Sequence, residues 1–523
     1  MSKPIVLVVL DGWGITNTLQ GNAIRQAHIP TFETLNKSYP LAILQASGMS
    51  VGLPWGVAGN SEVGHMTMGA GRIIYQNLPR ITLAIDDGSF FENKTLLSAT
   101  QSAKEKGTAL HLIGLLSTGS VHSHKDHLHA LLRLAKQEGL EKVFVHIFTD
   151  GRDSGPMSGI QEVERLQIFL GELGVGTIAS VSGRHYAMDR NHNWDRISEA
   201  YQMLTKGSPA NCVDPEQLLT NSYQDGFTDE YVVPTNITGS DGKKNLICPN
   251  DSVIFFNFRE DRARELTDAF TDPDFTHFER ELLPLNFITM VEYEQGQRAA
   301  VAFPPVTAKN TLGETLSIHS KKQIRIAETE KYAHVTYFFN GGAEQPFPGE
   351  DRKLIPSQIV THFDEAPEMS APQITDAVIQ ALRSEQYDFI LVNYANPDMV
   401  GHTGNEKATI KAVEATDKNL EQLIPAVLER DGILIITSDH GNAEEMYHAI
   451  SNEPDTEHST NPVPCWFITS HNHHEKSGEQ MMREQSQVNG LLSDIAPTIL
   501  ELLELPAPNE MNGSSLLRIF GKV

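Results

Sequence analysis

The chain has 523 residues, of which 21% are charged and 40% hydrophobic, so a length prior of about 150 residues per domain predicts a soluble protein of several units. No run reaches the roughly 18 consecutive apolar residues that a membrane span needs. The 41 basic and 67 acidic residues give a net charge of −26, which argues against nucleic acid or an anionic membrane as partner. Cys212, Cys248 and Cys465 form no disulfide pattern, and the apolar N-terminal run has no basic flank or cleavage site, so we expect a cytoplasmic protein.

Short apolar runs alternate with helix-length segments along the whole chain. In chain order the runs are IVLVVL, ALHLIGLLS, VFVHIFTDGRD, GTIASVSGR, SVIFFNFRED, FITMVEY, DFILVNYANPD and GILIITSDHGN. Runs of this length, rich in Val and Ile on both faces, are typical of parallel strands covered by helices. The predicted fold class is therefore α/β with mainly parallel sheets. Ligands bind beyond the carboxyl ends of such strands, so the residues after each run are candidates for a site.

The first run ends at Asp11, and a glycine-rich stretch, GVAGNSEVGHMTMGAGR, follows at residues 56–72 with Ser61 as its one serine. A serine hydroxyl is a poor nucleophile unless a base or a cation activates it. Because no base is visible beside Ser61 in the sequence, we expect a bound cation to activate its hydroxyl. The glycines at 56, 59, 64, 69 and 71 would then let the backbone turn tightly and bring Ser61 to the cations. The alternative is a glycine-rich surface loop with an incidental serine.

Cationic side chains follow the strands in the middle of the chain. The polar residues at these strand ends are His122, Arg152, Asp153, Arg184, Arg190, Arg259 and Arg262. A single arginine here could be a solvated surface residue. Guanidinium groups bind phosphate and carboxylate in a bidentate manner, however, and their repeated placement in an acidic protein indicates a binding site for an anion that carries both groups.

Carboxylates and histidines follow the late strands. Asp398 and His402 come after FILVNYAN, Asp439 and His440 come after ILIITS, and His458 precedes PVPCWFIT. Any single Asp-Gly after a strand could be a simple turn. Together with Asp11, however, these residues form a ligand set for two divalent ions, which could be Mn²⁺, Co²⁺ or Zn²⁺ and are less suited to Mg²⁺. Two ions would also explain the activation of Ser61.

Several longer motifs give the chain a family resemblance. GNSEVGH, GRDSGP, SGRHYAMDRN, NFREDRARE, AETEKYAHVTYFFNGG, NYANPDMVGHTG, TSDHGNAE and HSTNPVP occur in this order over nearly the full length. They resemble the cofactor-independent phosphoglycerate mutases, which belong with the alkaline-phosphatase-like metalloenzymes. The resemblance implies a phosphatase-like metal-binding domain made of residues 1–75 and 310–523, with an α/β phosphotransferase domain, residues 76–309, inserted between the two segments.

The resemblance also assigns the site residues. It implies one metal on Asp398, His402 and His458, a second metal on Asp11, Ser61, Asp439 and His440, and substrate contacts from His122, Arg152, Asp153, Arg184, Arg190, Arg259, Arg262 and Lys331. It favours two Mn²⁺ ions per chain and a monomer. Lys331 comes from the resemblance alone, because its position in TEKYAHV otherwise reads as a solvated charge on a helix or turn.

The implied reaction interconverts 3-phosphoglycerate and 2-phosphoglycerate, in glycolysis and gluconeogenesis, without bisphosphoglycerate. Ser61 would take the phosphoryl group, Lys331 and the cations would offset its charge, and glycerate would turn within the site with Asp153 as base. Closure of the inserted domain would keep water from the phosphoserine. The alternatives are a phosphopentomutase or phosphate-ester hydrolase of the same superfamily, for which a clamp for carboxylate plus phosphate would be idle, and a binding protein without catalysis.

Overall fold

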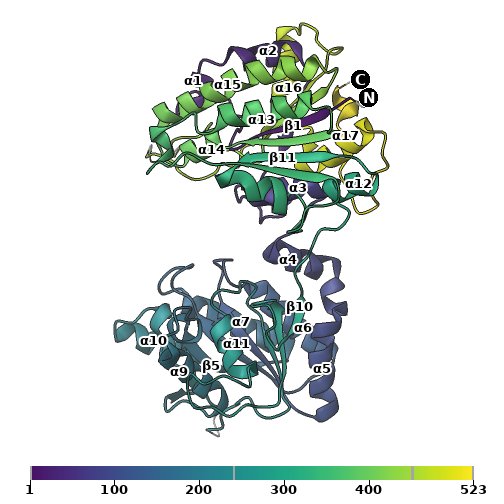
Figure 1. Ribbon diagram of the computed structural model, residues 1–523. Helices are drawn as coiled ribbons and strands as arrows, with labels where there is room; N and C mark the ends of the chain where they lie inside the picture. The colour runs from purple at the N-terminus through teal and green to yellow at the C-terminus, as the bar shows by residue number, and fades with distance from the viewer. Residues whose placement is uncertain (1–2, 240–241, 449–450, 452, 521–523) are drawn as a thin grey trace. The chain divides into compact units, whose positions relative to one another are not determined.

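Two eight-stranded sheets form the centres of the two units into which the chain divides (Figure 1). The computed structural model describes residues 3–239, 242–448, 451 and 453–520. Met1–Gln76 and Val306–Val523 together form what we call the split unit, and Asn77–Pro305 forms the inserted unit. In the described part of the chain, no helix combines the length and the apolar character needed to span a membrane.

The sheet of the split unit is parallel over its first five strands. In spatial order its strands are β12 (Glu350–Ile355), β11 (Gln323–Glu328), β13 (Phe389–Tyr394), β1 (Ile5–Leu10), β14 (Ile433–Thr437), β15 (Val463–Ile468), β2 (Leu41–Gln45) and β16 (Gly490–Leu491). Strand β15 runs antiparallel to both of its neighbours. Strand β1 has the burial pattern of a central strand, with all six residues buried. The amino end of β15 therefore lies at the same edge of the sheet as the carboxyl ends of β11, β13, β1 and β14.

Helices cover both faces of this sheet (Figure 1). The longer ones are α2 (Pro30–Ser38), α3 (Ser61–Ala70), α12 (Leu312–Ile318), α13 (Ala371–Arg383), α15 (Glu406–Leu428), α16 (Gly478–Ser486) and α17 (Ile495–Leu502), and the short ones are α1 (Ala23–Gln26), α14 (Asn396–Gly401) and α18 (Leu517–Phe520). One apolar core joins the sheet to α2, α13 and α15, and a second joins its other face to α3, α12 and α17. The residue pattern explains this division, because alternate side chains of each strand point to opposite faces.

The sheet of the inserted unit has parallel strands from β10 to β5. Its spatial order is β10 (Ala300–Phe303), β9 (Asn286–Val291), β8 (Ser252–Phe255), β3 (Leu110–Leu116), β4 (Val143–Thr149), β5 (Thr177–Gly183), β7 (Thr235–Ile237) and β6 (Asn211–Cys212). Its helices are α4 (Asn77–Asp87), α5 (Lys94–Lys106), α6 (Lys125–Gln137), α7 (Gly159–Leu173), α8 (Arg184–Ala187), α9 (Trp194–Thr205), α10 (Pro215–Gln224) and α11 (Arg264–Thr271). A single apolar core joins the sheet to α5, α6, α7, α9 and α11.

The predicted α/β class with mainly parallel sheets is confirmed. Every apolar run named above contains a strand, and PVPCWFIT contains β15. The sequence pattern missed β11, the neighbour of β13, because Arg325 and Glu328 make it look polar. Arg325 is nevertheless fully buried, and its guanidinium group lies over the rings of Phe339 and Phe389 at 4.8 and 5.2 Å. Stacking on two aromatic rings stabilises a charge that the strand pattern could not anticipate.

Buried histidines make the inserted unit sensitive to acid. Burial, reinforced by the positive charge of His124 and only partly offset by Asp126, lowers the pKa of His127 to about 3. An unfolded chain binds a proton on this residue below about pH 6.5, whereas the folded chain does not, so stability falls as the pH drops below that value. At pH 5 the loss is about 2 kcal/mol for this histidine.

We therefore expect the midpoint of unfolding of the inserted unit to lie at a lower denaturant concentration at pH 5 than at pH 7.5. Trp194 is the one tryptophan of this unit, and its fluorescence in a chain with Trp13, Trp55 and Trp466 replaced by Phe measures the transition. Replacing His127 by Asn should reduce the difference between the two pH values. An equal midpoint at both pH values would contradict the burial of a neutral histidine.

Candidate active site

Four neighbouring parallel strands of the split unit deliver charged side chains to one edge of the sheet. Lys331 follows β11, Asp398 follows β13, Asp11 follows β1, and Asp439 and His440 follow β14. These strands pair in parallel in the order β11, β13, β1 and β14, so their carboxyl ends meet at the same edge. The site is thus at the position that the strand-end rule predicts.

Two histidines converge on Asp398. The Nε2 atoms of His402 and His458 each lie 3.3 Å from Asp398 Oδ1 and 3.0 Å from one another. The opposite ring nitrogens face backbone carbonyls, with His402 Nδ1 at 2.7 Å from Thr456 O and His458 Nδ1 at 2.8 Å from Gly59 O. A carbonyl can only accept a hydrogen bond, so each Nδ1 carries a proton, and each Nε2 faces the carboxylate. This arrangement fits a divalent cation.

Ser61 is the first residue of α3 and its hydroxyl faces the same edge of the sheet. Its Oγ lies 3.1 Å from Asp11 Oδ1, 3.0 Å from His440 Nε2 and 2.8 Å from Lys331 Nζ. The side chain of Asn60 caps the helix, as expected for an N-cap asparagine. The positive end of the helix dipole favours an anion at Ser61. The sequence indicated no partner for the Ser61 hydroxyl, whereas the structure places the imidazole of His440 beside it.

The charges at this edge are strongly coupled. Burial opposes the charge on Lys331, but Asp11 and Asp398, whose oxygens lie 2.7 and 2.6 Å from Nζ, outweigh it and raise the pKa of Lys331. Burial likewise opposes the charge on His440, and the neighbouring carboxylates, led by Asp439, raise the pKa of His440 to about 10. Against burial, Lys331 and the nearby histidines hold the pKa of Asp398 well below its usual range.

The donor set fits cations. Asp11, Asp398 and Asp439 are three buried carboxylates, and Asp439 Oδ2 is buried without a hydrogen-bond partner. Three groups in the described residues bring their ligand atoms within 4.8 Å of one another, namely Asp398 with His402 and His458, Asp11 with Asp398 and His440, and Asp11 with His65 and Asp439. The seven predicted metal ligands therefore lie in one connected cluster. Their division between two ions stays a prediction.

The predicted role of the glycines near Ser61 is only partly right. Gly56 and Gly71 have positive φ angles of 76° and 62°, which glycine adopts without strain. Gly59, Gly64 and Gly69 instead allow close packing. A Cβ atom at Gly64 would lie 2.6 Å from Asp439 O, so this glycine lets α3 approach the loop after β14. Most of the stretch is helix α3, so a tight turn is confined to its ends.

Sequence analysis missed three polar residues that support the carboxylates. Asn393 Nδ2 donates to Asp11 Oδ2 at 2.7 Å, and Asn442 Nδ2 donates to Asp398 Oδ1 at 2.9 Å. His65 lies one turn after Ser61 on α3, a spacing that places both side chains on one helix face and could have identified it. The spacing around Lys331 taken alone predicted a solvated charge, and only the family resemblance assigned this residue to the site. It is buried, and its position directly after a strand was the available signal.

The inserted unit repeats the strand-end pattern with cationic groups. Neighbouring parallel strands β8, β3, β4 and β5 end at one edge of its sheet. The predicted residues that follow them are Arg259 and Arg262 after β8, His122 after β3, Arg152 and Asp153 after β4, and Arg184 and Arg190 after β5. We call these seven residues the arginine cluster. Lys331, the remaining predicted substrate contact, belongs to the split unit.

Arg184 is the most buried member of the arginine cluster. Its Nη1 lies 2.6 Å from Asp150 Oδ1 and 2.5 Å from Asp153 Oδ2. Ser117 Oγ donates to the other oxygen of Asp150 at 2.5 Å. Burial opposes the charge on Arg184, but the two carboxylates outweigh it and raise its pKa. Asp150, which sequence analysis did not select, thus fixes the direction of this guanidinium group.

Asp261 joins the other side of the arginine cluster. Its carboxylate lies 2.9 Å from Arg190 Nη1, 3.3 Å from Arg259 Nε and 3.5 Å from His122 Nδ1. Burial and the neighbouring Arg184 lower the pKa of His122 to about 4. Burial and the nearby guanidinium groups, led by Arg184, also lower the pKa of Arg262. The cluster therefore brings five guanidinium groups together at one edge of the sheet, where carboxylates orient several of them, and guanidinium groups are donors that suit an anion.

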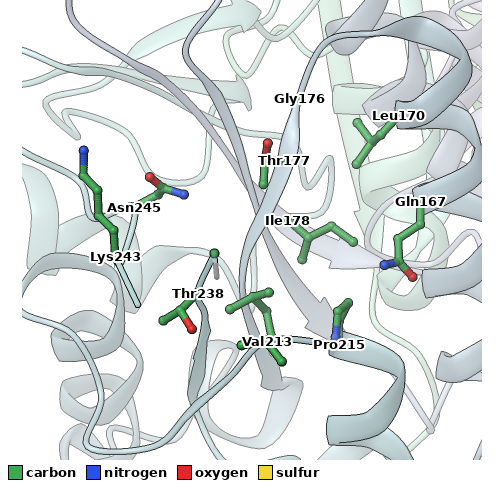
Figure 2. Close-up of a pocket in the computed structure, with 12 residues that line it drawn as sticks. Gln167, Leu170, Gly176, Thr177, Ile178, Val213, Pro215, Thr238, Lys243 and Asn245 are labelled. Atoms are coloured by element: carbon green, nitrogen blue, oxygen red, sulfur yellow. The ribbon is translucent and has the colours of Figure 1, made fainter. Parts of the chain in front are cut away.

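A separate cavity of about 560 Å³ lies at the other end of β5 (Figure 2). Leu170, Thr177, Ile178 and Val213 line it, near the first residues of that strand. Arg184 follows the last residue of the same strand. No member of the arginine cluster is among the described residues that line this cavity. We therefore do not regard the cavity as the candidate site, despite its volume.

Known proteins match this chain over nearly its whole length. The family model described as the metalloenzyme superfamily matches residues 3–507. A 2,3-bisphosphoglycerate-independent phosphoglycerate mutase from Clostridium botulinum is 49% identical over 517 residues, covering 99% of both chains. One from a Cyanothece species is 50% identical, covering 99% of this chain and 96% of the relative. The chain belongs to this family of mutases.

The structural comparison agrees with this membership. The crystal structure of a phosphoglycerate mutase from Leishmania mexicana, at low cobalt concentration, is 30% identical, has a TM-score of 0.56 and covers 98% of this chain and 97% of its own. The resemblance inferred from the motifs is therefore confirmed. As a member of a metalloenzyme family of phosphoglycerate mutases, the chain is an isomerase that binds divalent metal and acts on a small molecule.

Proposed function

We propose that the chain interconverts 3-phosphoglycerate and 2-phosphoglycerate, in glycolysis and gluconeogenesis, through a phosphoserine on Ser61 and without bisphosphoglycerate. The observation that carries this proposal is the environment of Ser61 Oγ, which lies within 3.1 Å of Asp11, His440 and Lys331 at the start of α3. A hydroxyl in such surroundings can become a nucleophile and can then carry a phosphoryl group. The names of the relatives support the substrate class.

Two divalent ions, which the resemblance identifies as Mn²⁺, complete the proposed site. Asp398, His402 and His458 would hold one ion, and Asp11, Ser61, Asp439 and His440 would hold the other. When bound, the ions lower the pKa of the Ser61 hydroxyl and offset negative charge on the phosphoryl oxygens. The buried carboxylates and the unpaired Asp439 Oδ2 support this assignment.

Side chains of the protein bind the substrate and carry out the transfer of the phosphoryl group and of the protons. The arginines of the cluster and His122 would bind the carboxylate and phosphate of the substrate, and Asp153 would contact its hydroxyl group. Ser61 attacks the phosphorus atom in line, and the ammonium group of Lys331 stabilises the charge that develops on the phosphoryl oxygens. The positive end of α3 stabilises the phosphoserine. The bond from phosphorus to the departing glycerate oxygen breaks, and Asp153 gives that oxygen a proton. Glycerate stays bound and turns, and Asp153 accepts the proton of the hydroxyl group that takes the phosphoryl group back.

The cellular setting follows from the same proposal. The protein would work in the cytoplasm as a monomer with a small-molecule substrate. The free state of its three cysteines, which is usual in a reducing compartment, supports the cytoplasmic part of this proposal.

Metal removal tests the proposal. We expect purified protein to convert 3-phosphoglycerate to 2-phosphoglycerate without added bisphosphoglycerate, to lose this activity after chelation, and to regain it when Mn²⁺ is restored. Co²⁺, Zn²⁺ and Mg²⁺, added singly, rank the ions. Activity that survives chelation, or that requires bisphosphoglycerate, would contradict the proposed function. Release of inorganic phosphate without 2-phosphoglycerate would instead identify a hydrolase.

A further inference from the structure

His65 lies among the predicted metal ligands, with a ring nitrogen within 4.8 Å of carboxylate oxygens of Asp11 and Asp439. The proposed ligand assignment gives it no role. It is fully buried on α3, one turn after Ser61. Its Nδ1 lies 2.8 Å from Ser61 O and 3.2 Å from Asp439 Oδ2, and its Nε2 lies 3.2 Å from Asn393 Nδ2. The same Nδ2 atom lies 2.7 Å from Asp11 Oδ2. The ring thus connects two carboxylates that the proposal places on a cation.

The chemistry of its neighbours fixes the hydrogen on this ring. The carbonyl of Ser61 can only accept a hydrogen bond, so Nδ1 carries the proton. A carboxylate can also only accept, so the Asn393 atom beside Asp11 must be the amide nitrogen, which then donates its second hydrogen to His65 Nε2. Both ring nitrogens are therefore engaged, and neither has a lone pair free for a metal. This distinguishes His65 from His402 and His458, whose Nε2 atoms converge on Asp398.

We propose that His65 is a positioning residue that sets the spacing between Asp439 and Asp11, and that it is not a metal ligand. Its Nδ1–H donates to Ser61 O and lies 3.2 Å from Asp439 Oδ2, which has no hydrogen-bond partner of its own, and its Nε2 holds the Asn393 amide against Asp11. Gly64 makes this contact possible, because a Cβ atom there would lie 2.8 Å from Asp439 Cβ and force α3 away. The inference rests on the proposed assignment of Asp11 and Asp439 to a cation.

Two isosteric variants separate the functions of the two ring nitrogens. In His65→Asn the amide nitrogen can occupy the place of Nδ1, donate to Ser61 O and keep the contact with Asp439. In His65→Gln the amide group reaches the place of Nε2 and keeps the contact with Asn393, but loses the N–H group beside Asp439. Met68→Leu is the matched control, because Met68 is buried in the apolar core on the same helix.

The measurements are the Mn²⁺ dissociation constant by titration calorimetry and the metal content per chain by mass spectrometry. We expect His65→Gln to weaken Mn²⁺ binding about 10- to 100-fold, the usual effect of losing a group that orients a ligand. His65→Asn should weaken it less, Met68→Leu should leave it unchanged, and saturating Mn²⁺ should still load two ions in every variant.

Three results would overturn the inference. A loss of one ion per chain in both His65 variants would show that His65 is itself a ligand. Equal affinities in wild type and His65→Gln would show that it has no positioning role. Absence of Mn²⁺ binding by the wild-type protein would overturn the proposed function together with this inference, whereas the first two results affect His65 alone.

Discussion

Ser61→Ala is expected to lower kcat for the mutase reaction by about 10⁶-fold, the scale seen when a covalent nucleophile is removed. The variant loses the one atom that accepts the phosphoryl group, and no neighbouring group can replace it. Substrate binding should change only a few-fold, because the charges that hold phosphate and carboxylate are those of the arginine cluster. Steady-state kinetics and equilibrium binding of 3-phosphoglycerate measure the two quantities.

Ser47→Ala is the matched control for this variant. Ser47 is also a buried serine of the split unit, and its Oγ donates to Thr460 O at 2.9 Å. Each substitution removes a hydroxyl with hydrogen-bond partners, at a cost to stability of about 1 kcal/mol. Ser47→Ala should keep its activity. Turnover by Ser61→Ala above about one per cent of the wild-type rate would remove Ser61 from the mechanism.

Lys331→Met should lower kcat by about 10²- to 10³-fold, as for other removed groups that stabilise transition-state charge. Its Nζ lies 2.8 Å from Ser61 Oγ, so it can stabilise the phosphoryl oxygens during both transfers. Met fills a similar volume without a charge. Because the ammonium group repels cations bound by Asp11 and Asp398, the affinity for Mn²⁺ should not fall and is expected to rise.

Two measurements distinguish a catalytic role of Lys331 from a purely structural one. Kinetics at saturating Mn²⁺ measures kcat, and calorimetry measures metal affinity. A variant with wild-type kcat would contradict a catalytic role of Lys331. A variant that loses both metal and activity would show that the lysine holds Asp11 and Asp398 in place instead.

A strand was predictable from the sequence where its buried residues are also apolar. Strand β1 is apolar on both faces, as a central parallel strand requires, and its pattern was unambiguous. Strand β11 was not predictable, because Arg325 is stabilised by Phe339 and Phe389, which are distant in sequence or on another strand. Pattern reasoning cannot include a contact that exists only after folding.

Some residues of the candidate site were likewise predictable from the sequence, and others were not. Asp11, Asp398 and Asp439 were predictable, because the carboxyl ends of neighbouring parallel strands meet at one edge. His65 could have been identified only from its spacing to Ser61 on α3, and the role of Asn393 depends on its hydrogen bonds to Asp11 and His65. Asp150 and Asp261 do follow strands β4 and β8, but their role in orienting the arginine cluster depends on ion pairs that the sequence does not show.

The most direct test of the central claim is to locate the phosphoryl group during turnover. Metal-loaded protein is mixed with 3-phosphoglycerate that carries a labelled phosphate, quenched with acid within milliseconds, digested and sequenced by mass spectrometry. The account predicts labelled phosphoserine at Ser61, formed before 2-phosphoglycerate appears and lost when unlabelled substrate is added. Full turnover with no label on Ser61, or with label on a histidine, would contradict it.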